Sequence, residues 1–219
     1  MTKQHKQKAL DTLNTEWLAK ELSLKSVATN GVPGEGNPDA EIVFVGEGPG
    51  KDEDEQGRPF VGAAGKFLTE LIESIGFRRQ DVFIANIIKH RAPGNRDPLP
   101  VEIEEYVPWL NKQIEIIQPK IIVTLGRFSM EHFLGDGLSI SKIHGEPKRV
   151  VIKRSGLPAG RQVILPMYHP AAALYRGDLR PVLHEDFAKI PKVLELINQA
   201  GTLAIDPEVA EAAAQQTLL

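Results

Sequence analysis

The sequence contains no cysteine among its 219 residues. Disulfide bonds, thiolate zinc sites, thiol nucleophiles and the usual ligands of iron–sulfur clusters are therefore excluded. No apolar run approaches the length of a membrane-spanning helix, and the N-terminal segment lacks the apolar core of a signal peptide. From these absences we expect a cytoplasmic protein.

The chain also lacks a strong charge of either sign. Lysine and arginine number 26, against 29 aspartates and glutamates, for a formal net charge of −3. Composition alone therefore does not predict nucleic-acid binding, and any basic surface must be local. The length suits one α/β domain with a sizeable core.

Glycine, by contrast, is concentrated in one stretch. The apolar run Ile42 to Val45 predicts a buried strand and leads into Gly46-Glu47-Gly48-Pro49-Gly50. A strand followed by a glycine turn and a helix is typical of sites that hold anions or nucleotides. The acidic residues 52 to 55 would repel phosphate, however. The loop therefore favours a neutral, planar ligand beside placed carboxylates, with Phe60 available to stack on it.

Apolar periodicity predicts an alternation of strands and helices along the rest of the chain. Further strands are expected at 82–85, 120–125 and 163–167. The segment 149–152 could form another strand, joined to the last one by an exposed turn at 153–161. Helices are expected at 9–24, 63–75, 100–117, 127–134 and 186–198. This order indicates a mainly parallel sheet with helices on both faces. We expect an N-terminal arm over 1–24, whose first eight residues are polar and mobile, a domain over 25–198 and a frayed tail over 199–219.

Three polar residues follow the ends of predicted strands. Glu47, Asn86 and His169 each lie just past the end of such a strand. In a parallel sheet, ligands bind beside the carboxyl ends of the strands. We therefore expect these three side chains to converge on one crevice.

Several motifs together resemble one known family. They are Gly46 to Gly50 with Glu53-Asp54, the segment 57–62 with Ala64-Gly65, Asn86 to Lys89 with Arg91, Pro93, Asn95 and Arg96, Leu125-Gly126, and His169 to Ala172. In this order over roughly 34–197, the set resembles the uracil-DNA glycosylases, most closely family 4, the iron–sulfur type. The resemblance implies a three-layer αβα sandwich around a short, mainly parallel four-stranded sheet, and excision of uracil from DNA.

The chain departs from this family in one large respect. Family 4 holds an iron–sulfur cluster with four cysteines, whereas two of those positions fall at His90 and Tyr106 here and the other two within 9–22. We therefore expect no cluster and no metal. Tyr106, Trp109 and Trp17 are expected to fill the space.

The resemblance implies roles for three residues that would contact the base. His169 would donate a hydrogen bond to uracil O2 as negative charge builds there. Asn86 would accept from uracil N3 and donate to O4, and Phe60 would stack on the flipped base. The structural alternatives are that His169 caps a strand end, that Asn86 forms an Asx turn and that Phe60 is a core residue.

Glu47 and Glu53 are the candidate catalytic carboxylates. Other uracil glycosylases carry an aspartate at the third position of the glycine motif, where this chain has the substrate-binding candidate Gly48. Which carboxylate positions the water therefore stays open. The resemblance places Glu53 near C5 of uracil, where it would crowd a thymine methyl group.

Four basic residues are candidates for phosphate contacts: Lys89, Arg91, Arg96 and Arg176. Leu174 could fill the gap left by a flipped nucleotide, or it could be a core residue. The favoured function is a monofunctional, monomeric uracil-DNA glycosylase of base-excision repair that acts on uracil-containing DNA. The alternatives are a non-catalytic binder of DNA or damaged bases and an α/β enzyme that acts on a free nucleotide or nucleoside.

Overall fold

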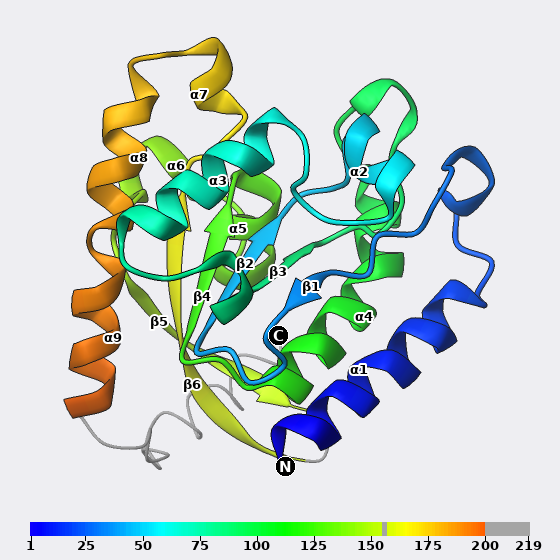
Figure 1. The fold of residues 1–219 in the computed structure, drawn as a ribbon, viewed down its shortest axis with the longest axis horizontal. Helices are drawn as coiled ribbons and strands as arrows, with labels where there is room; N and C mark the ends of the chain where they lie inside the picture. Colours follow the sequence, from blue (N-terminus) through cyan, green and yellow to red (C-terminus); the bar gives the residue numbers. More distant parts are fainter. Residues whose placement is uncertain (155–156, 200–219) are drawn as a thin grey trace.

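The computed structural model describes residues 1–154 and 157–199. It contains one sheet of six strands in the order β1-β3-β2-β4-β6-β5 (Figure 1). The strands are β1 (Glu35–Gly36), β2 (Ile42–Gly46), β3 (Phe83–Asn86), β4 (Ile121–Leu125), β5 (Lys148–Arg154) and β6 (Leu157–Met167). The four central strands are parallel, and the edge strands β1 and β5 are antiparallel to their neighbours.

Helices cover both faces of the sheet, as the three-layer αβα prediction requires. One face carries α3 (Ala63–Ser74), α8 (Leu179–Phe187) and α9 (Ile190–Gln199). The other carries α4 (Pro100–Ile117) and α5 (Arg127–Leu134), with α1 (Lys3–Leu18) packed against α4 (Figure 1). The short helices are α2 (Lys51–Gln56), α6 (Ile140–Ile143) and α7 (Ala172–Tyr175).

Alternating side chains along the strands build the two cores. In β2, Ile42 and Phe44 face the core beneath α3, α8 and α9, and Val43 and Val45 face the core beneath α4. A strand buried on both faces is apolar throughout. The five residues of β2 are all buried, which fixes the strand end from which the glycine loop departs.

The predicted count of four strands is wrong, because the sheet has six. The predicted strand at 149–152 is confirmed within β5. β1 has only two residues and therefore no apolar alternation to reveal it. Most of the predicted turn at 153–161 belongs to β5 and β6 instead, and its residues 155–156 lie outside the described residues.

The helix predictions hold for 63–75, 100–117 and 127–134, within a residue or so. Helix α1 begins at Lys3, within the segment 1–8 that we expected to be mobile, and the Thr2 side chain caps it by accepting from the His5 amide. The predicted closing helix at 186–198 corresponds mainly to α9, and most of α8 lies before it and was not predicted. Nearly all of the predicted tail, 200–219, lies outside the described residues.

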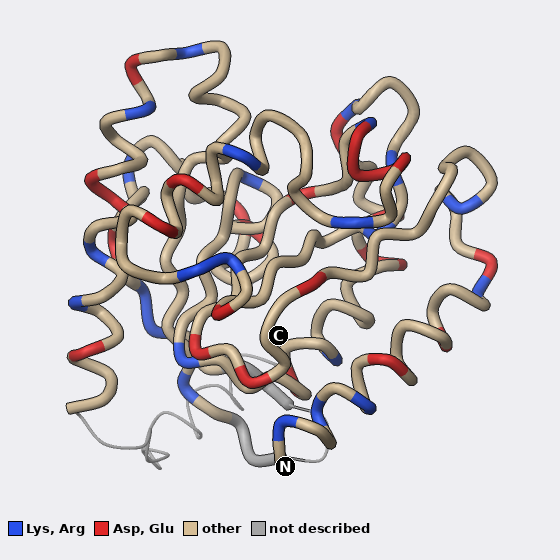
Figure 2. The backbone as a smooth tube through the Cα atoms, viewed as in Figure 1, with Lys and Arg blue, Asp and Glu red and all other residues tan. Residues whose placement is uncertain are grey.

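The acidic run 52–55 forms most of α2 rather than an irregular loop. Asp54 is 4% exposed, and its carboxylate accepts from the amides of Thr29 and Asn30 at 2.9 and 3.0 Å. Asp54 is therefore a buried residue that holds the backbone at 29–30. Basic and acidic residues are otherwise interspersed along the chain (Figure 2).

Candidate functional site

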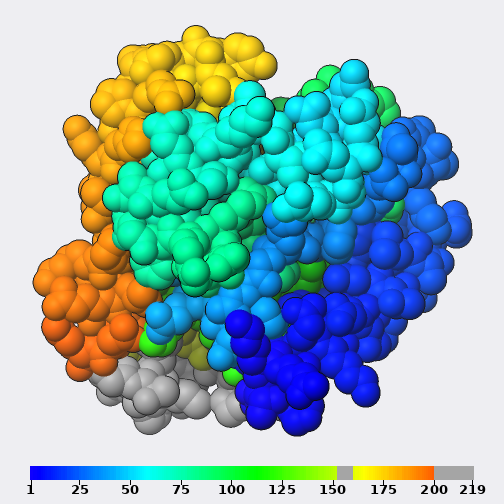
Figure 3. All heavy atoms as spheres, viewed as in Figure 1, coloured from blue at the N-terminus to red at the C-terminus, as the bar shows by residue number. Residues whose placement is uncertain are grey.

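A cavity of about 350 Å³ lies at the carboxyl ends of β2, β3 and β6. The structure brings seven of the predicted site residues together around it: Glu47, Gly48, Glu53, Phe60, Asn86, Arg96 and His169. In the space-filling view, the outline is indented at this end of the molecule, between the yellow segment that includes α7 and the cyan segment that includes α2 (Figure 3).

Asn86 ends β3 and is 2% exposed. Its Oδ1 is buried and has no hydrogen-bond partner among the described residues. Buried polar atoms are nearly always paired, so an unpaired acceptor that lines a cavity indicates a ligand with an N–H or O–H donor. A side chain at Gly46 would collide with this oxygen and lie 2.6 Å from the Phe60 ring. Glycine at position 46 therefore keeps the floor of the cavity open.

His169 follows β6 and presents a neutral ring. Its Nδ1 accepts a hydrogen bond from the Ala171 amide at 3.1 Å, so a neutral ring carries its proton on Nε2. Burial lowers the pKa of His169 to about 4. The ring is therefore a neutral hydrogen-bond donor through Nε2 at pH 7.

Phe60 stacks on His169, with ring centroids 5.5 Å apart and an angle of 25° between the planes. Its backbone φ is +50°, a left-handed conformation that is rare for an aromatic residue. Strained conformations of this kind persist only where surrounding contacts fix them. The conformation turns the Phe60 ring towards the cavity, which it lines.

Glu47 lines the cavity close to the N-terminus of α5. Burial raises the pKa of Glu47, although its Oε1 accepts from the Phe128 amide at 3.1 Å. A side chain at Gly126 would collide with this carboxylate. Glu47 is thus a poorly hydrated carboxylate that is held by backbone amides at the start of α5.

Glu53 uses both carboxylate oxygens to hold backbone amides. Oε1 accepts from Val61 at 2.8 Å and from Gly62 at 2.9 Å, and Oε2 accepts from Gly50 at 3.1 Å. This carboxylate ties the glycine loop to the segment that carries Phe60. Glu53 is therefore less able than Glu47 to hold a water molecule.

The structure also explains why position 48 is glycine. A Cβ atom there would lie 2.7 Å from the Ile88 side chain. Ile88 thus occupies the space into which a carboxylate at position 48 would project. Ile88, with Ala92 and Pro98, forms an apolar wall of the cavity that the sequence analysis missed, because its residues stand in a basic, loop-like segment.

Lys89 does not fit its predicted phosphate contact. The side chain is fully buried, and Nζ donates to the Asn86 carbonyl at 2.8 Å and to Gln113 Oε1 at 2.7 Å. Burial lowers the pKa of Lys89 to about 7. A phosphate at the surface cannot reach this ammonium group, so we correct its role to support of the turn after β3.

The other candidates for DNA contacts lie nearer the surface. Arg96 pairs with Glu102 through two hydrogen bonds of 2.8 and 2.5 Å, while Arg91 donates to Asn95 at 2.7 Å. Leu174 in α7 is 43% exposed, and the pair of Arg176 with Asp178 is exposed too. Tyr175, which the sequence analysis missed, is 89% exposed in the same helix.

A buried aromatic cluster joins α1, the loop after β3 and α4. His90 Nδ1 and Tyr106 Oη lie 2.7 Å apart, and the Trp17 ring meets His90 edge-on at 5.5 Å. Trp17 and Tyr106 are fully buried, as expected. Trp109 is not in this cluster; it is partly exposed, and Lys112 lies over its ring.

Comparison with known proteins agrees with this geometry. The model of the uracil DNA glycosylase superfamily matches residues 33–193. The chain belongs to this superfamily. It is 51% identical over 176 residues to the type-4 uracil-DNA glycosylase of Sulfurisphaera tokodaii, which covers 78% of each chain. It is 46% identical over 187 residues to the type-4 enzyme of Archaeoglobus fulgidus, covering 83% of this chain and 92% of the relative.

The residues present do not fit the four-cysteine cluster that the resemblance to family 4 implies. The chain has no cysteine. His90 and Tyr106 bond to each other, and Trp17 packs against them. No group of three or more histidines or carboxylates in the described ranges could hold a metal ion. Within those ranges, too, every helix is too short or too polar to span a membrane.

Proposed function

We propose that this protein is a uracil-DNA glycosylase that hydrolyses the N-glycosidic bond of uracil in DNA and leaves an abasic site. The observation that carries this proposal is the unpaired Asn86 Oδ1 in a cavity that His169 and Phe60 also line. An acceptor, a neutral donor and an aromatic ring match the N3–H, the O2 atom and the planar face of uracil.

Asn86 would select the base. Its Oδ1 would accept from uracil N3–H, and its amide nitrogen would donate to O4. Cytosine presents an acceptor at N3 and a donor at C4, so both contacts would be repulsive. A site that leaves buried polar groups unpaired with the wrong ligand discriminates strongly against it.

His169 would stabilise the departing base. As the glycosidic bond breaks, negative charge gathers on uracil N1 and O2, and the Nε2–H of neutral His169 is available to O2. One preorganised donor of this kind contributes about 3 kcal/mol to the transition state. Stacking on Phe60 fixes the imidazole before the reaction begins.

Glu47 would position the attacking water at C1′ and stabilise the positive charge on the sugar. This assignment follows from the free capacity of its carboxylate, because both oxygens of Glu53 already accept from backbone amides. No lysine lines the cavity in the part of the chain that the structure describes. The proposed reaction is therefore simple hydrolysis, without a Schiff base.

The nucleotide would reach this cavity by flipping out of the duplex, which costs a few kcal/mol. Exposed Leu174 and Tyr175 lie six residues or fewer beyond His169 and would fill the gap in the stack. Arg91, Arg96 and Arg176 would contact phosphates. We further propose that the protein works as a monomer in the cytoplasm and without an iron–sulfur cluster.

The direct test uses three duplex oligonucleotides that differ only in a central uracil, thymine or cytosine. After incubation with the protein, hot alkali cleaves any abasic site. Strand scission confined to the uracil duplex supports the proposal. Binding without scission would favour the non-catalytic alternative, and release from free deoxyuridine alone would favour a nucleoside enzyme.

A further inference from the structure

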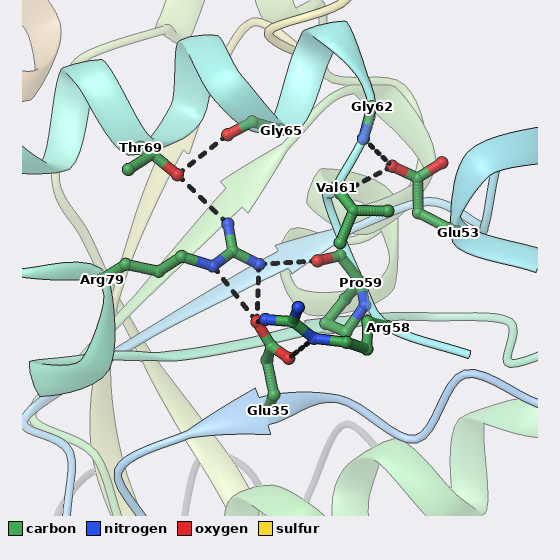
Figure 4. A network of polar contacts seen from close by, with 9 residues as sticks. All are labelled: Glu35, Glu53, Arg58, Pro59, Val61, Gly62, Gly65, Thr69 and Arg79. Carbon is green, nitrogen blue, oxygen red and sulfur yellow. Dashed lines mark hydrogen bonds and ion pairs between the residues drawn. The ribbon is translucent and has the colours of Figure 1, made fainter. Parts of the chain in front are cut away.

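The backbone on both sides of Phe60 is held by hydrogen bonds, at Pro59 on one side and at Val61 and Gly62 on the other (Figure 4). After it, the amides of Val61 and Gly62 donate to Glu53. Before it, the Pro59 carbonyl accepts from Arg79 Nη2 at 2.6 Å. The strained backbone of Phe60 is thus fixed at both of its neighbours.

Arg79 is itself held rigidly, although it lies outside the cavity. Its Nε and Nη2 both donate to Glu35 Oε1, at 3.1 and 2.9 Å, and Nη1 donates to Thr69 Oγ1 at 3.3 Å. The Thr69 hydroxyl in turn donates to the Gly65 carbonyl at 3.0 Å. One guanidinium group therefore joins β1, the 57–62 loop and α3 (Figure 4).

Gly65 completes this arrangement. A side chain at Gly65 would collide with the backbone of Phe60, so the first turn of α3 packs directly on that residue. Arg79 and Glu35 are only 21% and 27% exposed in their side chains, so solvent competes weakly for their hydrogen bonds. The position of the Phe60 ring over the cavity follows from these contacts rather than from its own preference.

We propose that Arg79, held by Glu35, is a positioning residue that acts through Phe60 on the excision step. This inference rests on the proposed glycosylase function. Loss of the Pro59 contact frees the backbone of Phe60 to relax from its left-handed conformation. The ring then leaves its place beside His169, and both the stacking surface and the donor to O2 lose their alignment. Misplacement by about 1 Å at a reacting centre can lower a rate by a hundredfold.

The test compares Arg79→Gln with Arg78→Gln. Arg78 is the adjacent arginine, but it is exposed and pairs with Asp81 rather than with the 57–62 loop. We expect Arg79→Gln to lower the single-turnover rate of uracil release by at least about tenfold, with little change in affinity for the uracil duplex. Arg78→Gln should keep the rate of the unmodified protein. Equal rates for the two variants would overturn the proposal.

A double variant separates positioning from general destabilisation. If Arg79 acts through Phe60, Arg79→Gln combined with Phe60→Leu should be no slower than Phe60→Leu alone. If the rate losses of the two single variants multiply in the double variant, the proposal is overturned. Should Arg79→Gln fold poorly, Arg79→Lys serves instead, because its ammonium group can pair with Glu35 but cannot also make the remaining guanidinium contacts.

Amide hydrogen exchange provides a readout that does not depend on activity. Peptides that cover 57–62 should exchange faster in Arg79→Gln than in Arg78→Gln. An inactive unmodified protein with this difference would refute the glycosylase proposal and leave the support of Phe60 by Arg79 standing. An active protein without the difference would refute the positioning proposal alone.

Discussion

At the scale of single residues, the proposed site depends on neutral His169 and on Asn86 Oδ1, which has no partner among the described residues. Asn86→Asp replaces the donor to uracil O4 with an acceptor, and a buried repulsive contact costs about 1–3 kcal/mol. We expect the single-turnover rate on uracil DNA to fall by roughly ten- to a hundredfold. Asn111→Asp, on the exposed side of α4, is the matched control and should keep the rate. Equal activity in Asn86→Asp would make Asn86 a turn residue.

The pKa directions predict an unusual dependence of the rate on pH. His169, with its pKa lowered to about 4, stays neutral from pH 5 to 8, so its protonation should not affect the rate there. Burial raises the pKa of Glu47 above its ordinary value, and the proposed role of Glu47 in positioning water requires its ionised form. The single-turnover rate should therefore fall as the pH drops through that raised pKa.

Glu47→Gln is the control for this assignment. Its rate should be lower throughout but should not fall further as the pH drops through the raised pKa of Glu47. An acid limb centred near pH 6.5 that survives in Glu47→Gln would mean that His169 titrates as an ordinary histidine.

The sequence predicted that Glu47, Asn86 and His169 lie close together, because the carboxyl ends of the strands in a parallel sheet meet at one edge. It could not predict that Lys89 is buried, since that depends on Gln113 in a different element. The roles of Glu53 and Arg79 were hidden for the same reason. Their partners are backbone groups of a loop whose course the sequence does not fix.

At the scale of elements, α1 and the loop after β3 are joined by His90, Tyr106 and Trp17. Tyr106→Phe removes a buried hydrogen bond and leaves His90 Nδ1 without its partner. We expect the free energy of unfolding to fall by about 1–2 kcal/mol in urea titrations. Tyr175→Phe, at a fully solvated hydroxyl, should change it by no more than about 0.5 kcal/mol. Equal stability of Tyr106→Phe and the unmodified protein would contradict a joining role for this cluster.

Apolar periodicity predicted the long elements well, including α4 and α5, because their buried faces decide their conformation. It missed α2, whose acidic run has no apolar stripe and is fixed instead by contacts of Asp54 and Glu53. It missed β1 for a similar reason. Such short elements form only because the surrounding fold supplies their partners.

At the scale of the whole molecule, this chain belongs to the uracil-DNA glycosylase superfamily but lacks the cysteines of the cluster that its resemblance to family 4 implies. We expect purified protein to be colourless and to contain no stoichiometric iron, even after expression in medium rich in iron and sulfide. Visible absorbance and iron content measure this together. An iron–sulfur absorption band with several iron atoms per chain would contradict it.

The molecule as a whole also separates DNA affinity from chemistry. The net charge of −3 does not favour binding to DNA. The affinity for DNA must therefore come from arginines and apolar side chains around the cavity, whereas the rate of uracil release must come from residues inside it. His169→Ala removes a donor that acts mainly in the transition state. It should therefore affect the rate far more than the affinity.

The most direct measurement is single-turnover release of uracil from duplex DNA, made beside a binding titration at the same salt concentration. The unmodified protein and His132→Ala, altered at a histidine outside the cavity, should release uracil rapidly. His169→Ala should be slower by about a hundredfold or more, with nearly unchanged binding. No release of uracil by the unmodified protein would contradict the account, and so would a loss of rate in His169→Ala matched by an equal loss of binding.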